Sequence, residues 1–324
     1  PKHTAHRGLL MRLITPKRLK ENEDAMWQLA DEILDEFLIA GEGEFIEGFA
    51  GPFTLRVIAD LLGVPEQDRP ELLERLARGT HGSALGHADK TMNKTPLEYL
   101  YDVFATYVEE RRAAPRDDVL TGLATARFPD GTVPEVADVV RVATNVFSAG
   151  QETTVRLLST ALKVIGDQPE IQAKLRADRS LLPNFIEECL RIESPVKGDF
   201  RLSRVPTTVG GQALGAGSTL MVINAAANRD PRRFEAPDAF DPERKNARQH
   251  LAFGRGIHSC PGAPLARAET RVGIERLLDR TADIRISEKH HGPAENRRFQ
   301  YIPTYILRGL TQLHLEFDLV EQNR

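Results

Sequence analysis

The sequence predicts a mainly α-helical fold with a small β region, formed by residues 1–324 as a single domain. Three observations lead to this prediction. Apolar residues recur at helical spacing through most of the first 193 residues and again over 262–280. Residues 200–223 alternate and are broken by glycines, which is typical of short strands joined by turns. No repeat, low-complexity segment or linker divides the chain.

Helices are expected in order along the first half of the chain. Thr15 followed by Pro16 supplies an N-cap residue and a proline at the first helical position, and apolar residues of helical period follow. A buried helix over 49–62 should end at Gly63. Further helices are predicted over 71–78, 97–112, 134–165 and 182–193.

The second half of the chain changes character. Short strands and a hairpin are predicted over 200–223, followed by an ordered meander rich in Pro, Asp and Arg over 228–246. The segment 262–280 has the spacing of a helix again. Strands are expected over 301–317, around Gly309.

Composition and net charge argue against several classes of protein. The chain has 43 Lys and Arg against 47 Asp and Glu, a formal net charge of −4, which gives no support for nucleic-acid binding. No apolar run approaches the ~20 residues of a membrane-spanning helix. Two cysteines, Cys189 and Cys260, cannot form a disulfide scaffold, so a reducing, cytoplasmic compartment is expected. The chain begins Pro-Lys-His-Thr without Met, so we expect that N-terminal residues are missing and that the lack of a membrane segment holds only for the part shown.

The strongest chemical signal is the segment from Phe253 to Gly262, which reads Phe-Gly-Arg-Gly-Ile-His-Ser-Cys-Pro-Gly. Its cysteine, Cys260, lies in a glycine-rich loop directly before a predicted helix. A helix N-terminus carries partial positive charge and free N–H groups, which favour a thiolate over a thiol. The glycines permit positive φ and let the backbone approach a flat or bulky group. Such a cysteine could be a nucleophile, a redox thiol or a metal ligand.

Two further patterns lie on predicted helices. Glu188 and Arg191 are three residues apart and share a helix face, where they can form a charge-assisted pair. Gly150 lies within the long helix and costs it about 1 kcal/mol relative to alanine, so its presence requires a reason. The threonines that follow, in the segment Ala149 to Thr154, can bond to a preceding carbonyl and open the helical turn locally.

These motifs resemble those of the cytochrome P450 superfamily, in its soluble bacterial type. The Cys260 loop matches every fixed position of the family's haem-binding signature, Phe-Gly-x-Gly-x-His-x-Cys-x-Gly. The pair Glu188 and Arg191 is similar to the family's Glu-x-x-Arg helix, and the segment 149–154 to its oxygen-activation motif. The resemblance runs over essentially the whole chain. It implies the cytochrome P450 fold, with haem between the long helix and the helix that follows the cysteine.

The resemblance also implies a role for each motif residue. Cys260 would be the thiolate ligand to the iron of a non-covalent haem b, and Thr153 and Glu152 would deliver protons to O2. Arg244 would join Glu188 and Arg191 in a network that supports the site. The other haem-binding positions would be His258, Arg201, His3, Arg7, Phe253, Gly254, Gly262, Ala149 and Gly150. The substrate pocket would be lined by Val142, Asn145, Val146, Val196, Ile306 and Leu307.

The implied activity is monooxygenation, in which one oxygen atom of O2 is inserted into an apolar small molecule. The glycines at 254 and 256 lack the third glycine of a dinucleotide fingerprint, so the electrons must come from outside this chain. The resemblance implies an external ferredoxin and its reductase as their source. Arg255, Arg267 and Arg271 could form a basic docking face for it. Two alternatives are a peroxygenase driven by hydrogen peroxide and a non-catalytic haem- and ligand-binding protein. The Glu152–Thr153 pair argues against both.

Overall fold

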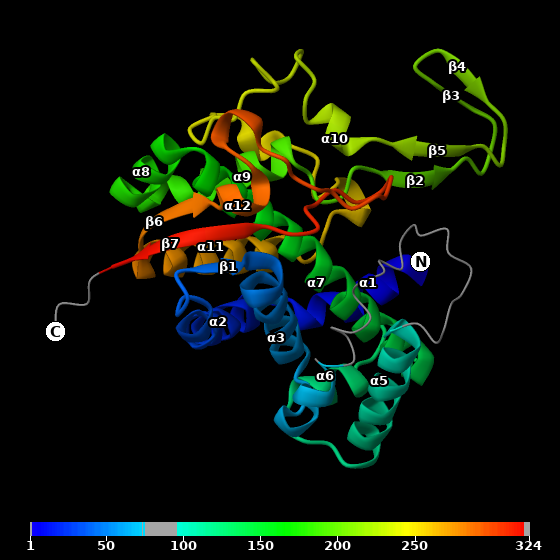
Figure 1. The fold of residues 1–324 in the computed structure, drawn as a ribbon. Coiled ribbons are helices and arrows are strands. Elements are labelled where there is room, and N and C mark those ends of the chain that lie inside the picture. The colour runs from blue at the N-terminus through cyan, green and yellow to red at the C-terminus, as the bar shows by residue number, and fades with distance from the viewer. Residues whose placement is uncertain (1, 73, 75–95, 321–324) are drawn as a thin grey trace.

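The computed structural model describes residues 2–72, 74 and 96–320 (Figure 1). Its helices are α1 (Lys2–Leu13), α2 (Pro16–Phe37), α3 (Gly51–Leu62), α5 (Pro96–Ala113), α6 (Val119–Ala124), α7 (Val136–Asp167), α8 (Pro169–Ala177), α9 (Leu182–Ile192), α10 (Asn224–Ala227), α11 (Ala263–Arg280) and α12 (Glu288–His291). Its strands are β1 (Glu42–Glu44), β2 (Asp199–Leu202), β3 (Thr207–Val209), β4 (Gln212–Leu214), β5 (Thr219–Val222), β6 (Thr281–Ile286) and β7 (His314–Leu319). The helix expected over 71–78 falls mostly outside the described residues.

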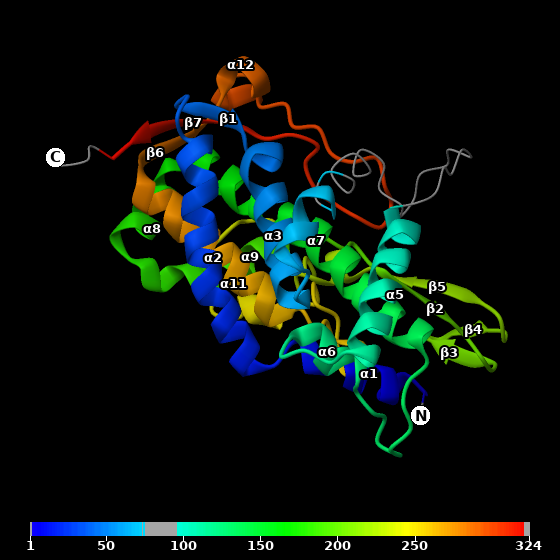
Figure 2. The same ribbon diagram turned by 90° about the horizontal axis from the view of Figure 1, so that it is seen from below.

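Helix α7 is the central element of the fold. It runs through the middle of the molecule, with α3, α5 and α11 packed against it (Figures 1 and 2). Its C-terminal half is apolar on several sides, and Leu157, Leu158, Ala161 and Leu162 are at most 1% exposed. A helix that is apolar nearly all round is typical of a core position. One continuous cluster of buried apolar side chains extends along the chain from Leu9 to Phe317.

The helix ends follow the signals in the sequence. The Thr15 hydroxyl accepts a hydrogen bond from the Arg18 N–H at 3.3 Å, which caps α2. Helix α3 ends at Gly63, whose φ of +71° suits glycine. The bounds of α5, α7, α9 and α11 lie within two residues of those predicted, whereas α6 and α8 were not predicted. Among the described helices, none combines the length and the apolar composition needed to cross a membrane.

The strands form two separate β regions. Strands β1, β7 and β6 form one antiparallel sheet in that order, while β2 pairs with β5 and β3 with β4. The two regions lie at different ends of the molecule, with α7 between them (Figures 1 and 2). The prediction of strands over 301–317 is only partly correct, because β7 begins at His314 and the earlier residues form isolated bridges. Close packing explains Gly309, since a Cβ there would lie 2.5 Å from the Arg156 Cγ.

Candidate active site

The loop that carries Cys260 is shaped by its glycines. Gly254 and Gly256 have φ angles of +64° and +75°, in the left-handed region that favours glycine. The chain turns back on itself there, so that the Cys260 N–H donates to the Phe253 carbonyl at 2.8 Å. Gly262 is the N-cap residue of α11. The thiol is therefore held immediately before the N-terminus of α11.

The Cys260 thiol experiences opposing influences. Part of the residue is exposed to solvent, yet the surrounding protein excludes enough water to raise the pKa of the thiol above its usual value. The N–H groups of Gly262 and Ala263 and the charges of Arg7 and Arg267 lower this pKa without outweighing the first effect. The start of α11 therefore favours a thiolate, as the sequence predicts, but burial has the larger effect on this pKa. A bound metal cation would deprotonate such a thiol, so the position suits a metal ligand better than a free nucleophile.

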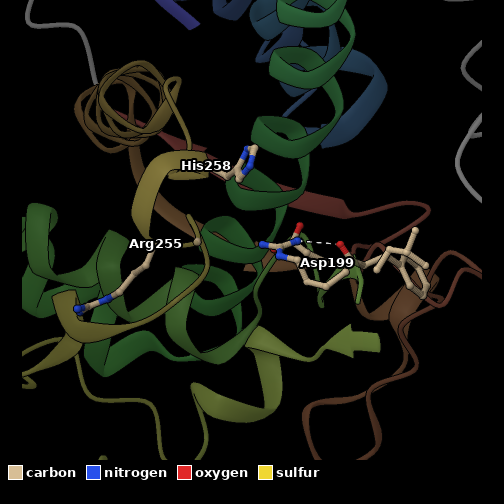
Figure 3. Close-up of a pocket in the computed structure, with 7 residues that line it drawn as sticks. Asp199, Arg255 and His258 are labelled. Atoms are coloured by element: carbon tan, nitrogen blue, oxygen red, sulfur yellow. Dashed lines mark hydrogen bonds between the residues drawn. The ribbon is translucent and has the colours of Figure 1, made fainter. Parts of the chain in front are cut away.

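Four basic residues from three elements gather beside this loop. The rings of His3 and His258 lie 4.3 Å apart between centroids, and the Arg7 guanidinium donates to the Ser259 carbonyl at 2.6 Å. Arg201 of β2 lines a neighbouring pocket together with His258 (Figure 3). Loss of surrounding water, and then the positive charges of His258 and Arg7, lower the pKa of His3. Crowded basic groups of this kind suit an anionic ligand.

The donor set fits the prosthetic group that the sequence implies. Within the described part of the chain, none of His3, Arg7, Arg201 and His258 forms an ion pair with a carboxylate. A haem carries two carboxylates at one edge and an iron that takes a thiolate ligand. Arginines and histidines without a carboxylate partner, next to a single thiol, match both requirements.

Helix α7 carries the residues predicted to act on oxygen. The Thr153 hydroxyl donates to the Ala149 carbonyl at 2.9 Å, the bond expected from the sequence. The Glu152 carboxylate forms an ion pair with Arg156, one turn further along. Gly150 has a packing role, because a Cβ there would lie only 3.0 Å from the Ile58 Cδ1 of α3.

The structure brings together only part of the predicted substrate pocket. Val142 and Asn145 line a cavity of about 430 Å³ together with His3, Arg7 and His258. Val146 is 7% exposed and belongs to the core cluster. Val196 and Leu307 form an isolated β-bridge, and Leu307 is buried. Neither they nor Ile306 line this cavity or the pocket of Figure 3.

The predicted supporting residues form a buried network. Arg191 holds both oxygens of the Glu188 carboxylate at 2.7 Å, and the Arg244 Nε donates to the same carboxylate at 2.9 Å. Arg191 also donates to the carbonyls of Asn228, Pro237 and Ala239, all in the segment 228–246. The network therefore ties that segment, which has little regular secondary structure, to α9.

Comparisons with known proteins identify this arrangement. The family model described as Cytochrome P450 matches residues 84–282. Cytochrome P450 144 of Mycobacterium tuberculosis is 34% identical over 325 residues, covering 97% of this chain and 70% of that protein. The chain belongs to the cytochrome P450 family. The monooxygenase PikC of Streptomyces venezuelae is 32% identical over 320 residues, covering 98% of this chain and 74% of that protein.

Solved structures of the family agree with the fold. Substrate-free CYP150A6 of Mycobacterium marinum superposes with a TM-score of 0.92 at 57% identity, covering 99% of this chain and 75% of that one. CYP109E1 of Bacillus megaterium, solved with corticosterone, gives a TM-score of 0.86 at 30% identity, covering 98% and 83%. This P450 chain is accordingly an enzyme of the monooxygenase type, and its family uses a haem-thiolate cofactor and O2.

A second buried acid supports the Cys260 loop of this P450, and the sequence analysis missed it. Glu187 of α9 receives hydrogen bonds from Arg267 at 2.6 and 3.0 Å, and its carboxylate lies 2.9 Å from the His250 Nε2. Burial raises the pKa of Glu187, but the bonds from His250 and Arg267 outweigh burial and lower it to about 2. Arg267 in turn lies over the Phe253 ring, 4.7 Å from its centroid. In the sequence, the one indication of this role is that Glu187 directly precedes Glu188 of the Glu-x-x-Arg motif.

The structure corrects the basic face expected for an electron donor. Arg267 is neutralised by Glu187, and Arg271 pairs with Glu23 and Glu275. Arg255 is exposed, and its side chain extends away from Asp199 and His258 (Figure 3). Only Arg255 of the three expected arginines therefore has no ion pair within the described residues.

A third acid, Glu269 of α11, lies directly behind the oxygen-activation motif. It is 1% exposed, and its carboxyl interacts with the Thr154 side chain. Burial raises the pKa of Glu269 to about 8, so the group is protonated at neutral pH. Its position at helical spacing from the buried residues Leu265 and Val272, on an apolar face, was the available signal in the sequence.

Proposed function

We propose that this P450 chain inserts one oxygen atom of O2 into a largely apolar small molecule, with Cys260 as the thiolate ligand of haem b. The observation that carries the proposal is a cavity shared by three elements of the described structure. Residues of α7, of α1 and of the Cys260 loop meet there, and all the basic groups predicted for the haem carboxylates lie in it or in the adjoining pocket. We also propose that residues 1–324 form one domain, which the continuous core supports.

The residues present would bind the haem in a defined way. When bound, the haem supplies the redox chemistry through which O2 is activated. Cys260 would hold the iron, and His3, Arg7, Arg201 and His258 would bind the two carboxylates. Phe253, Gly254 and Gly262 would form the face on the cysteine side, and Ala149 and Gly150 the face on the α7 side.

Thr153 and Glu152 would manage protons on the α7 side. The Thr153 hydroxyl gives its own proton to the Ala149 carbonyl, so its oxygen lone pairs are directed elsewhere and can accept. The Glu152 side chain is 32% exposed and so exchanges protons with water. Protons would pass from water to Glu152 and then to the Thr153 hydroxyl.

Electrons would come from an external ferredoxin-type donor. The exposed Arg255 lies five residues before Cys260 and is free of ion pairs within the described part of the chain. A positive residue near the cofactor steers an acidic partner towards it.

Replacement of Thr153 by alanine tests the assignment of the α7 motif. Thr153→Ala should still consume reductant at a similar rate, but the yield of product per electron pair should fall about tenfold or more and hydrogen peroxide should replace it. Thr153→Ser keeps the hydroxyl and should retain most of the coupling. Product yield and peroxide are measured together in a reconstituted system with ferredoxin and reductase. Unchanged coupling in Thr153→Ala would contradict the assignment, and efficient turnover with hydrogen peroxide alone would instead indicate the peroxygenase.

A further inference from the structure

The face of α7 that borders the cavity is polar. Arg141 and Asn145 line the cavity, and Ser148 and Ala149 continue the same face towards Thr153. All four are exposed, although most of their neighbours in the helix are buried. Their spacing of four, three and one residues places all of them on one side of an α-helix. Thr153 continues the same side one turn further. A molecule lying along this side therefore meets an amide and a hydroxyl before it reaches the oxygen-activation motif.

The apolar residues of this stretch present little exposed surface to the cavity, although Val142 is part of its lining. Val142 and Val146 are 8% and 7% exposed and pack into the core cluster. Apolar contacts along this part of α7 are thus limited to small areas of side chain. An entirely hydrocarbon ligand would remove water from the Asn145 and Ser148 side chains without replacing its hydrogen bonds, which is unfavourable.

Asn145 and Ser148 have hydrogen-bonding capacity to spare. Within the described residues, neither side chain makes a hydrogen bond. Arg141 is already paired with Asp138 at 2.9 Å, and the basic residues on the Cys260 side of the cavity are those that the proposed function assigns to the haem carboxylates. The groups left for a ligand are neutral and both donate and accept. They match a hydroxyl or carbonyl oxygen better than a carboxylate.

We propose that the substrate carries a neutral hydroxyl or carbonyl oxygen, which hydrogen-bonds to Asn145 and Ser148 and anchors an otherwise apolar skeleton along α7. This inference rests on the proposed function for where oxidation occurs. At 1.5 Å per residue, Asn145 lies about 6 Å along the helix axis from Ala149 and about 12 Å from Thr153. Oxidation is therefore directed to a carbon several bonds away from the anchored oxygen.

Matched ligands test the anchor without the need for turnover. Three pairs that share a carbon skeleton serve as probes: cyclododecanol with cyclododecane, androstanol with androstane, and androstanone with androstane. Their dissociation constants are measured by calorimetry on the haem-loaded protein and on three variants. Asn145→Leu and Ser148→Ala remove the two anchoring groups. Thr144→Val is the matched control, because the Thr144 hydroxyl is on the same helix but is buried and unpartnered within the described structure.

The oxygen-bearing probe should bind more tightly than its hydrocarbon in at least one pair. Asn145→Leu should reduce that preference about five- to tenfold, which corresponds to one neutral hydrogen bond, and Ser148→Ala should reduce it about threefold. Thr144→Val should leave the preference unchanged. The proposal is wrong if no alcohol or ketone binds better than its hydrocarbon, which includes the case in which none binds. It is also wrong if Thr144→Val has the same effect as Asn145→Leu.

The same preparation separates this inference from the proposed function. A carbon monoxide spectrum typical of thiolate-ligated haem, together with no preference for the oxygen-bearing probes, would overturn the anchor alone. A spectrum without that band would overturn the proposed function, while the calorimetric preference would still decide whether Asn145 and Ser148 bind an oxygen. Oxidation at the carbon that bears the anchored oxygen would contradict the spacing derived from α7.

Discussion

Two buried polar regions of this P450 are built in opposite ways. In the network of Glu188, Arg191 and Arg244, carboxylate and guanidinium groups are matched, and the remaining donors reach backbone carbonyls. Behind the oxygen-activation motif, the Arg156 Nε and the Glu269 Oε2 are buried without a hydrogen-bond partner in the described structure. The comparison shows that the first region acts as a rigid frame. The second region leaves buried polar groups without partners next to α7, the helix that carries the residues proposed to transfer protons.

Removal of Arg191 from the frame should cause the largest loss of stability among the changes described below. Arg191→Ala would leave the Glu188 carboxylate buried with only part of its partners, and should lower the free energy of unfolding by about 3–5 kcal/mol. Arg191→Lys keeps the charge but loses the two-pronged geometry, so an intermediate loss is expected. Urea unfolding of the haem-loaded variants provides the measurement.

An exposed ion pair in the same segment provides the control for the frame. The side chains of Lys174 and Glu243 are 53% and 54% exposed and pair at 2.7 Å. Glu243→Gln should change the free energy of unfolding by less than about 0.5 kcal/mol. Equal losses in Glu243→Gln and Arg191→Ala would contradict the distinction between a frame and a solvated surface.

The pH dependence of the free energy of unfolding should distinguish the region around Glu269 from the frame. Its pKa of about 8 in the folded protein lies above the ordinary value of 4.5, so the folded state holds a proton that the unfolded chain releases. Its contribution to stability is complete below pH 4.5, decreases as the pH rises to about 8, and then stays constant. Glu269→Gln removes this titration. The variant should be within about 1 kcal/mol of the parent protein in stability near pH 5 and exceed it by about 4 kcal/mol at pH 8.

Glu187, the buried acid that lies next to the frame in α9, should behave in the opposite way. The pKa of Glu187 is lowered to about 2, so its contribution to stability is present above 4.5 and is lost only as the pH falls towards 2. Glu187→Gln should therefore destabilise the protein by about 2 kcal/mol at both pH 5 and pH 8. Unfolding free energies of both variants at these two pH values test the contrast. Parallel pH dependence in Glu187→Gln and Glu269→Gln would contradict the difference between a paired and an unpaired buried acid.

Sequence reasoning found the elements that depend on local signals. Thr15 and Pro16 indicated the start of α2, Gly63 indicated the end of α3, and the spacing of Glu188 and Arg191 indicated their ion pair. The short motifs also pointed to the Cys260 loop and to the α7 segment. These features were accessible because each depends on residues within one or two helical turns.

Features that depend on distant parts of the chain were not accessible in the same way. The Glu187 cluster joins α9, His250 and α11, and no local pattern shows that Arg267 is already neutralised. The pKa of Cys260 depends on how much water the fold excludes, which outweighs the helix terminus. The exposure of each α7 side chain likewise depends on which neighbours cover it, so the sequence did not indicate that Val146 packs in the core cluster.

The most direct test of the account is the difference spectrum of the reduced protein with and without carbon monoxide. The parent protein should show the strongly red-shifted Soret band of thiolate-ligated haem. Cys189 is buried in α9 and gives a matched control, so Cys189→Ala should keep the band while Cys260→Ser loses it. A band that persists in Cys260→Ser, or a parent protein whose spectrum resembles that of histidine-ligated haem, would contradict the central role of Cys260.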